Sequence, residues 1–271
     1  MSEDVNDDHI PGEEADIAPI LSDWEYEPGT INVRRIVGAD GKPKLQMRLE
    51  LGLLQMEESG RPDGQRPDGF ESLLEMHEKR IADHKQKNGG TVQGFGLKPD
   101  ECQLLREEAA MYYQRYLSLF VLGDFPAVVR DTTRNLRVLD LCGKFALDEQ
   151  DRLVLEQYRP YILMMRTRAD ASIQVRDQKY HQALDTVRAG LSDIRGFFEK
   201  FGHPEAFDQC DEVKVLKRFA REIKKKLPVG QVERLQRKLK RAVAQEQYEL
   251  AAKLRDQIAA MQDKPQLRHD A

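Results

Sequence analysis

The sequence predicts a mainly α-helical protein, with a small β-hairpin near its N-terminus and a helical hairpin near its C-terminus. Apolar residues recur at helical spacing over most of the chain from Pro99 onward. Before that point, alternating apolar residues flank Asp40 and Gly41, a pattern typical of two strands joined by a tight turn. Since 40% of the 271 residues are apolar, the chain can bury a core over most of its length.

The two ends of the chain differ in charge. Residues 1–28 hold ten acidic side chains and no Lys or Arg, and three prolines there disfavour a helix. We therefore expect 1–28 to be an acidic, disordered tail, and we expect 264–271 to be a second disordered tail. Residues 214–241 hold twelve basic side chains against two acidic ones, so a strongly basic segment precedes the C-terminal hairpin.

The N-terminal third is expected to hold the strands and one helix. Residues 29–69 combine the β-hairpin with two R-P-D-G turns, in which Pro presets φ and Gly ends the turn. Residues 70–98 are predicted to form a helix followed by a Gly-rich linker. The alternation that predicts the second strand continues through four apolar residues, Leu45, Met47, Leu49 and Leu51.

Residues 99–228 are predicted to form a domain of irregular, repeat-like helical hairpins. An aromatic residue, Phe125, Tyr180 or Tyr248, stands at three of the predicted joints. We expect it to fill the open end between two antiparallel helices, and the small residue that follows it lets the helices approach closely. The first two joints loosely resemble those of tetratricopeptide repeats. Phe125 and Tyr180 are 55 residues apart, and Tyr180 and Tyr248 are 68 apart, whereas tetratricopeptide repeats have a fixed period of about 34 residues. The array is therefore TPR-like but irregular. The individual helices are predicted at 99–122, 126–142, 148–175, 180–201 and 207–227.

The C-terminal segment 231–263 is predicted to form a tight helical hairpin with one apolar face on each helix. Its pattern, L-x-x-x-L-x-x-A-V-x-x-E-x-Y-E-x-A-A-x-L-R-D-x-I from Leu235 to Ile258, resembles the UVR motif of excinuclease subunits B and C, which also occurs in some Clp-type chaperones and in activators of bacterial protein-arginine kinases. The N-terminal block is similar to uncharacterised bacterial proteins that end in such a motif.

The resemblance implies an interaction module that pairs with another UVR hairpin, in the same protein or in a partner. The residues that it implies for the interface are Leu235, Leu239, Tyr248, Ala251, Ala252, Leu254, Arg255 and Ile258. The rest of the chain departs from the excinucleases, because it has neither a helicase phosphate-binding loop nor a nuclease domain.

Signatures of catalysis are missing from the sequence. No G-x-x-x-x-G-K-[ST] or G-x-S-x-G motif appears, and no clustered carboxylates suggest acid/base chemistry. Three widely spaced cysteines, Cys102, Cys142 and Cys210, suggest neither a disulfide framework nor a zinc site and fit a reducing compartment. We therefore expect a cytoplasmic protein without enzymatic activity, cofactor, metal or membrane contact.

Two hypotheses of function follow. The first is an adaptor or regulator that docks a protein partner, or a second copy of itself, through the C-terminal hairpin. The alternative is a nucleic-acid-associated protein of DNA repair or the stress response, since clustered basic side chains can follow a phosphate backbone. Its candidate contact residues are Lys217, Arg218, Arg221, Lys224, Lys225 and Lys226.

Overall fold

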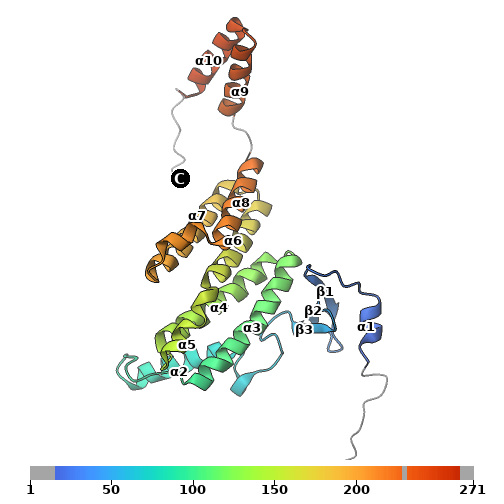
Figure 1. Ribbon diagram of the computed structural model, residues 1–271, viewed down its shortest axis with the longest axis vertical. Helices are drawn as coiled ribbons and strands as arrows, with labels where there is room; N and C mark the ends of the chain where they lie inside the picture. The colour runs from blue at the N-terminus through green and yellow to red at the C-terminus, as the bar shows by residue number, and fades with distance from the viewer. Residues whose placement is uncertain (1–15, 228–230, 263–271) are drawn as a thin grey trace, which may run out of the picture. The chain divides into compact units, whose positions relative to one another are not determined.

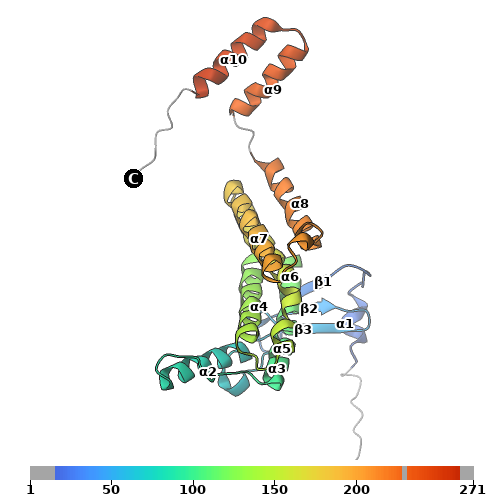
Figure 2. The same cartoon turned by 60° about the vertical axis from the view of Figure 1, so that its left-hand side comes forward.

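The computed structural model describes residues 16–227 and 231–262 and confirms a mainly α-helical protein with a small N-terminal sheet (Figures 1 and 2). The chain divides into two compact units, Met1–Arg221 and Glu222–Ala271. The helices of the described residues are α1 (Ala18–Ser22), α2 (Leu73–Lys87), α3 (Pro99–Val121), α4 (Phe125–Phe145), α5 (Glu149–Leu153), α6 (Arg159–Arg176), α7 (Tyr180–Lys200), α8 (Asp211–Lys226), α9 (Gln231–Ala244) and α10 (Tyr248–Gln262).

The sheet has three antiparallel strands in the order β1-β2-β3. They are β1 (Asn32–Val37), β2 (Pro43–Arg48) and β3 (Leu53–Glu57). Leu45 of β2 is fully buried, and its cross-strand neighbour Met56 is nearly so, because α3 packs on this sheet. On the other face, Arg34, Gln46 and Gln55 form a hydrogen-bonded row across all three strands.

The predicted hairpin is confirmed as β1–β2, but the sheet has a third strand, β3, that the alternating pattern did not predict. Leu49 and Leu51, expected in the second strand, lie in the turn that leads to β3, where the Leu49 amide donates to the Gly52 carbonyl at 2.8 Å. Leu51 is 91% exposed. Because β3 gives β2 a second hydrogen-bonded neighbour, the sheet is better supported than the two-stranded hairpin that the sequence predicts.

Part of the segment expected to be disordered has structure. Residues 1–15 lie outside the described residues, but Ala18–Ser22 forms α1, in which Pro19 stands in the first turn, where a missing N–H costs nothing. Trp24 lies under the guanidinium of Arg34, which is 4.2 Å from its ring centroid. The acidic segment therefore contacts the sheet before the first strand begins. The predicted tail 264–271 lies outside the described residues.

In the helical body, the long helices pack against one another in the order in which they follow along the chain. Helix α3 packs against α4, α4 against α6, and α6 against α7. The predicted helix 148–175 is in fact three pieces, α5, a short 3-10 turn at Glu156–Tyr158, and α6. Pro160 lies in the first turn of α6, and because it has no N–H to donate, one continuous helix through it would lose a backbone hydrogen bond.

The Gly-rich linker after α2 is folded against the helices. The ring of Phe95 lies 5.3 Å from that of Phe145 at the end of α4. The Leu97 amide donates to the Phe145 carbonyl at 2.7 Å, and the Leu97 carbonyl accepts from the Leu147 amide at 2.9 Å. The linker thus ties the end of α4 to the start of α3.

Three helix–helix joints share one local geometry. Gly123, Gln178 and Glu246 have left-handed φ angles of 73°, 61° and 57°. At each of them this residue's N–H donates to the carbonyl three residues back, and the following N–H donates to the carbonyl five residues back. This is the Schellman motif, which satisfies the last carbonyls of a helix. The aromatic residue that the sequence singled out comes two positions later and begins the next helix.

A buried ion pair connects the sheet to the helical body. The guanidinium of Arg115 in α3 donates two hydrogen bonds to the carboxylate of Asp131 in α4, at 2.7 and 3.0 Å, and both side chains are 1% exposed. The same guanidinium donates to the carbonyls of Glu57, at the end of β3, and Gly60. Every polar group of this buried cluster therefore has a partner, as burial of charge requires.

A second buried carboxylate, that of Glu108 in α3, holds the start of α2. It accepts from the amides of Leu73 and Leu74 at 2.8 and 3.4 Å, so it supplies acceptors to the free N–H groups of the first turn of α2. It also pairs with Arg61, from the first R-P-D-G turn, and with Arg134 in α4. The first R-P-D-G turn is therefore part of the fold.

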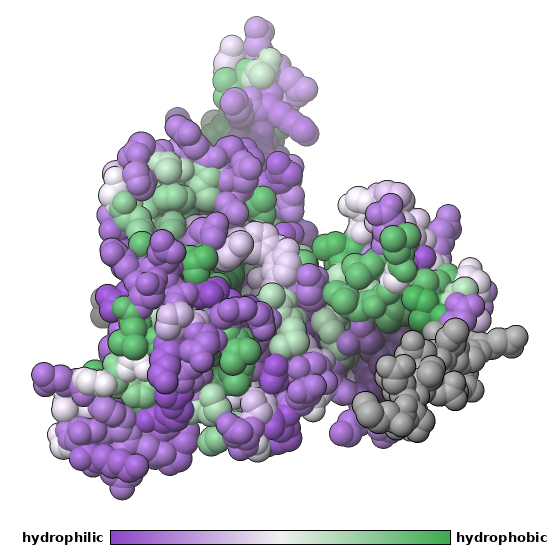
Figure 3. Space-filling view, turned by 60° about the horizontal axis from the view of Figure 1, so that its bottom comes forward, coloured by the Kyte–Doolittle hydropathy of each residue, from purple (hydrophilic) through white to green (hydrophobic). Residues whose placement is uncertain are grey.

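Exposed apolar side chains gather at the ends of the strands. In the face shown in Figure 3, a hydrophobic (green) area lies over the sheet and α1, while hydrophilic (purple) side chains cover most of the remainder. The exposed apolar residues in these elements or next to them are Ile17, Ile20, Ile31, Val37, Leu49 and Leu51.

We predict that Arg115→Met lowers the free energy of unfolding by about 3–5 kcal/mol, because the Asp131 carboxylate then stays buried without its bidentate partner. Urea denaturation followed by circular dichroism measures the change. Arg188→Met is the control, because its ion pair with Asp185 joins side chains that are 71% and 66% exposed and should leave stability unchanged. Equal effects of the two substitutions would contradict the role of the buried pair.

We also predict opposite effects for two glycines of α7. A Cβ at Gly190 would overlap the side chain of Thr167 in α6, so Gly190→Ala should destabilise the protein by about 1–3 kcal/mol. A Cβ at Gly196 would meet no atom within 4 Å, so Gly196→Ala should stabilise it by about 0.5–1 kcal/mol through helix propensity. Thermal unfolding of both variants measures the difference, and a stabilised Gly190→Ala variant would show that α6 and α7 do not approach closely here.

Candidate interaction hairpin and basic helix

Helices α9 and α10 pack against each other as an antiparallel hairpin. The connection is Gln245, Glu246 and Gln247, and Glu246 takes the left-handed conformation. The Glu246 amide donates to the Val243 carbonyl at 3.1 Å and the Gln247 amide to the Ala242 carbonyl at 2.9 Å. The Gln247 carbonyl in turn accepts from the Ala251 amide at 3.0 Å and so starts α10. Such a short connection makes the two helices antiparallel neighbours.

The inner face of the hairpin is small. Ala242, Ala251 and Leu254 are 2%, 8% and 7% exposed, and half-buried Leu235 and Leu239 pack against them. Ile258, one turn beyond Leu254, is also buried. We call these six residues the hairpin core. Alanine on both helices leaves room for the backbones to approach, which explains the close packing of two short helices.

The interface residues expected from the motif separate into two sets. The structure brings Leu235, Leu239, Ala251, Leu254 and Ile258 together in the hairpin core. Tyr248, Ala252 and Arg255 lie outside it and are exposed, and Tyr248 is exposed to 69%. Their spacing of i, i+4 and i+7 places them on one side of α10. We call these three residues the outer stripe.

Tyr248 therefore does not fill the open end of the hairpin, as an aromatic residue at a helical joint was expected to do. Its ring stands in solvent, whereas Phe125 at the equivalent place in the α3–α4 joint packs on Phe120 at 5.5 Å. The difference arises because α3 and α4 offer a second aromatic ring at this position. Val243 and Leu250, next to the connection, are also exposed, to 53% and 46%.

Ala242 is the core residue that the motif-based interface lacked. Among the hairpin residues whose burial is described, it is the most buried, at 2% exposure. Its position three residues after Leu239 and seven after Leu235 marks it as part of the same helix face. Helical periodicity alone therefore identifies it.

Helix α8 presents basic side chains along one face. Leu216 and Ile223 on its opposite face are buried. By helical spacing, Lys217, Arg218, Arg221, Lys224 and Lys225 lie together on the exposed side, and Lys226 lies beside them. The six residues expected to contact nucleic acid are thus all exposed on one helix.

Only part of this basic face is neutralised within the described residues. Lys214 pairs with Asp211 at 2.8 Å and Lys217 with Asp208 at 2.9 Å, and Lys217 also lies over the ring of Phe207. These contacts hold the pKa of both aspartates below the usual value. Arg218, Arg221, Lys224 and Lys225 form no ion pair with a described residue, so their charge faces solvent.

The described residues contain no group of three or more His, Cys, Asp or Glu side chains that could hold a metal ion. None of their helices is long and apolar enough to cross a membrane. Cys102, Cys142 and Cys210 are free thiols, and burial is the main cause that raises the pKa of each. A raised pKa disfavours the reactive thiolate.

Comparison with known proteins identifies one segment of the chain. Residues 230–264 match the model of the UvrB/uvrC motif (UVR), a span that contains both helices of the hairpin. Comparisons with curated proteins and with solved structures found no match. The motif occurs in UvrB/UvrC-type and related proteins and suggests protein or DNA interaction. The C-terminal helical hairpin of this protein is therefore a UVR motif.

Proposed function

We propose that the protein is an adaptor or regulator without catalytic activity of its own, which docks a partner or a second copy of itself through the UVR hairpin. The observation that carries this proposal is the division of the motif residues into two sets. Five of them stabilise the hairpin from inside. The remaining three form the outer stripe, where Tyr248 is 69% exposed and adds little to the stability of the hairpin.

The chemistry of the outer stripe suits a helical partner. Tyrosine and arginine are enriched among the residues that dominate binding energy at interfaces. Ala252, between Tyr248 and Arg255, lets a second helix approach α10 closely. Arg255 lies 3.4 Å from the carboxylate of Asp256, and both side chains are more than 70% exposed, so this pair remains available to a partner. We therefore infer that the partner presents a helix or helical hairpin, as another UVR motif would.

The size of the hairpin supports the same proposal. Isolated helices of fewer than about 12–15 residues are marginal in water, and α9 and α10 have 14 and 15. Among the hairpin residues whose burial is described, six side chains form the shared core, and Leu235 and Leu239 are only partly buried. Contact with a second apolar surface would cover these residues and stabilise both helices. The cytoplasm is the compartment we propose, since all three thiols are free.

We predict that Tyr248→Asp lowers partner recovery at least about tenfold, because it replaces the large aromatic ring of the outer stripe with a charge that binding would have to desolvate. The protein and its variants are used as bait in nuclease-treated lysate, and recovered proteins are quantified by mass spectrometry. Light scattering of the purified protein measures self-association. Truncation after Gly230 removes the hairpin and should abolish recovery completely.

Gln257→Asp is the matched control for this experiment. It places the same charge on α10, at an exposed position away from the outer stripe, and should leave recovery unchanged. Helicity of both variants is compared by circular dichroism. Equal recovery with the full chain, Tyr248→Asp and the truncated chain would contradict docking through the hairpin.

Nucleic-acid binding by α8 is the second candidate function. The specific observation in its favour is the set of four exposed basic residues, Arg218, Arg221, Lys224 and Lys225, that no described acidic residue neutralises. Their approach to a phosphate backbone would release counterions. The aspartates paired with Lys214 and Lys217 would weaken such binding at the first turns of the helix.

If α8 binds nucleic acid, affinity for labelled duplex or single-stranded DNA should fall steeply between 50 and 200 mM salt. Arg221→Gln and Lys225→Gln should each reduce the slope of log affinity against log salt concentration by about one, because each removes one phosphate contact. Lys214→Gln is the control, because its charge is already paired with Asp211. Absence of binding at low salt, measured by fluorescence anisotropy, would rule out this function.

A further inference from the structure

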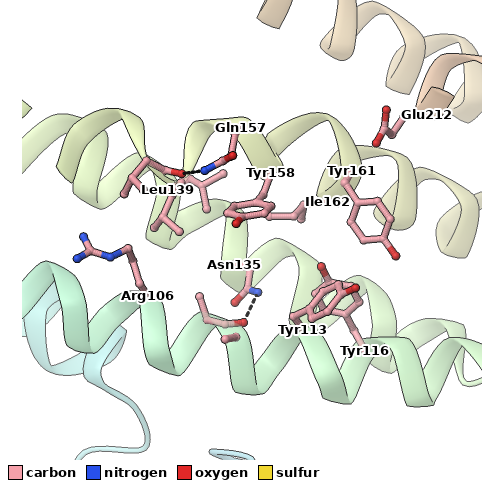
Figure 4. A pocket seen from close by; sticks show the side chains of 14 residues that line it. Arg106, Tyr113, Tyr116, Asn135, Leu139, Gln157, Tyr158, Tyr161, Ile162 and Glu212 are labelled. Atoms are coloured by element: carbon pink, nitrogen blue, oxygen red, sulfur yellow. Dashed lines mark hydrogen bonds between the residues drawn. The ribbon is translucent and has the colours of Figure 1, made fainter. Parts of the chain in front are cut away.

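A cavity of about 610 Å³ lies within the first unit, between α3, α4, α6 and the start of α8 (Figure 4). Its size is that of typical sites for small molecules, which range from about 300 to 1,000 Å³. It opens to solvent beside Tyr158, Val154 and Tyr113, which are 54%, 39% and 36% exposed. No function considered so far uses this cavity.

One end of the cavity is made of tyrosine rings. Tyr113 meets Tyr116 edge to face at 5.4 Å and Tyr161 at 6.0 Å, and Tyr158 completes the group. Burial, together with the neighbouring Tyr113 hydroxyl, raises the pKa of Tyr161 to about 12, and burial also raises the pKa of Tyr116. These phenols therefore stay neutral at pH 7. Neutral aromatic rings attract cations through their electron-rich faces.

The charge of the lining residues also favours a cation. Glu212, at the start of α8, lies at the tyrosine end of the cavity, as Figure 4 shows. Its carboxylate accepts a hydrogen bond from the Cys210 thiol at 2.9 Å and forms no ion pair with a described basic residue. Arg106, at the opposite end, is paired with the carboxylate of Asp151.

One further basic residue is close to this end of the cavity. The positive charge of Arg168 lowers the pKa of the Tyr161 hydroxyl, but burial, which raises this pKa, has the larger effect. Its guanidinium is stacked over the ring of Phe120 at 4.6 Å, and Arg168 does not line the cavity. Glu212 is therefore the lining residue whose charge is not balanced by an ion pair.

The remaining wall is apolar. Between the tyrosines and Arg106, the cavity is lined by aliphatic side chains from α3, α4 and α6 and from the segment before α6. These are Ala109, Ala110, Leu139, Val154, Leu155 and Ile162. Two amide side chains also line the cavity, and both already donate to backbone carbonyls, Asn135 to that of Ala109 at 2.9 Å and Gln157 to that of Val154 at 2.8 Å. A ligand must therefore bring an apolar body to match this wall.

We propose that this cavity binds a small organic cation, in which an ammonium group is carried on an apolar body. The ammonium lies among Tyr113, Tyr161 and Glu212, and the body contacts the aliphatic wall. An anion of the same shape is disfavoured by Glu212. A neutral molecule of that shape gains the apolar contact but neither the attraction of the rings nor that of the carboxylate.

Three probes of similar shape test this proposal on the full-length protein. 3-Phenylpropan-1-amine is a cation at pH 7, 3-phenylpropan-1-ol is neutral and 3-phenylpropanoate is an anion. Isothermal titration calorimetry or ligand-observed NMR gives their affinities at fixed, low salt. We expect the amine to bind about five- to tenfold more tightly than the alcohol, and the anion to bind more weakly than either.

Glu212→Gln should remove most of the preference for the amine while leaving the affinity for the alcohol unchanged. Asp211→Asn is the matched control, because this neighbouring carboxylate is 88% exposed and pairs with Lys214 away from the cavity. Tyr113→Leu should weaken the amine more than the alcohol, since it removes one ring and keeps an apolar side chain. Thermal unfolding confirms that each variant is folded.

The outcomes separate clearly. A preference for the amine that survives Asp211→Asn and is lost in Glu212→Gln supports the proposal. Equal affinity for amine and alcohol, equal effects of the two carboxylate substitutions, or no binding of any probe overturns it.

Discussion

The first unit depends on the ion pair between Arg115 and Asp131. A guanidinium in α3 meets a carboxylate in α4, and the same guanidinium holds the carbonyls that follow β3. Two helices and the sheet thus share one buried group. Arginine suits this place because its planar fork can donate to a carboxylate and to two carbonyls at once. Glu108 acts similarly between α2, α3 and α4, so buried charge, as well as apolar contact, fixes how these elements meet.

The same local rule shapes the body and the interaction hairpin. At Gly123, Gln178 and Glu246 a left-handed residue ends one helix and an aromatic residue starts the next two positions later. Glycine adopts this conformation freely, while Gln and Glu take it at a cost of about 1 kcal/mol or more. The two satisfied carbonyls at each joint offset that cost. What distinguishes the UVR hairpin is the environment of its aromatic residue, since Tyr248 is 69% exposed whereas Phe125 and Tyr180 are partly buried.

The hairpin and the cavity represent two kinds of recognition. In the proposed docking, the hairpin offers an exposed stripe and its partner supplies the apolar surface, so specificity would lie in the shape of the partner helix. The cavity has its wall already formed, and in the proposed binding the carboxylate of Glu212 and the tyrosine rings would select a cation. The basic face of α8 differs from both, because charge on an open helix face attracts phosphates without fixing their arrangement.

The sequence by itself determined the helical class, the β1–β2 hairpin, the aromatic joints and the UVR hairpin. These features depend on local signals, namely the spacing of apolar residues, the residue types at turns and the residue pattern of the UVR motif. Such signals act between residues that are close in the chain. Only the tertiary structure decided that β3 joins the sheet, that Pro160 begins a separate helix, and that Tyr248, Ala252 and Arg255 lie outside the hairpin core. The cavity joins Tyr113, Tyr161 and Glu212, which lie far apart in sequence. Their meeting depends on how α3, α6 and α8 pack, and side-chain packing between distant segments leaves no periodic signal in a single sequence.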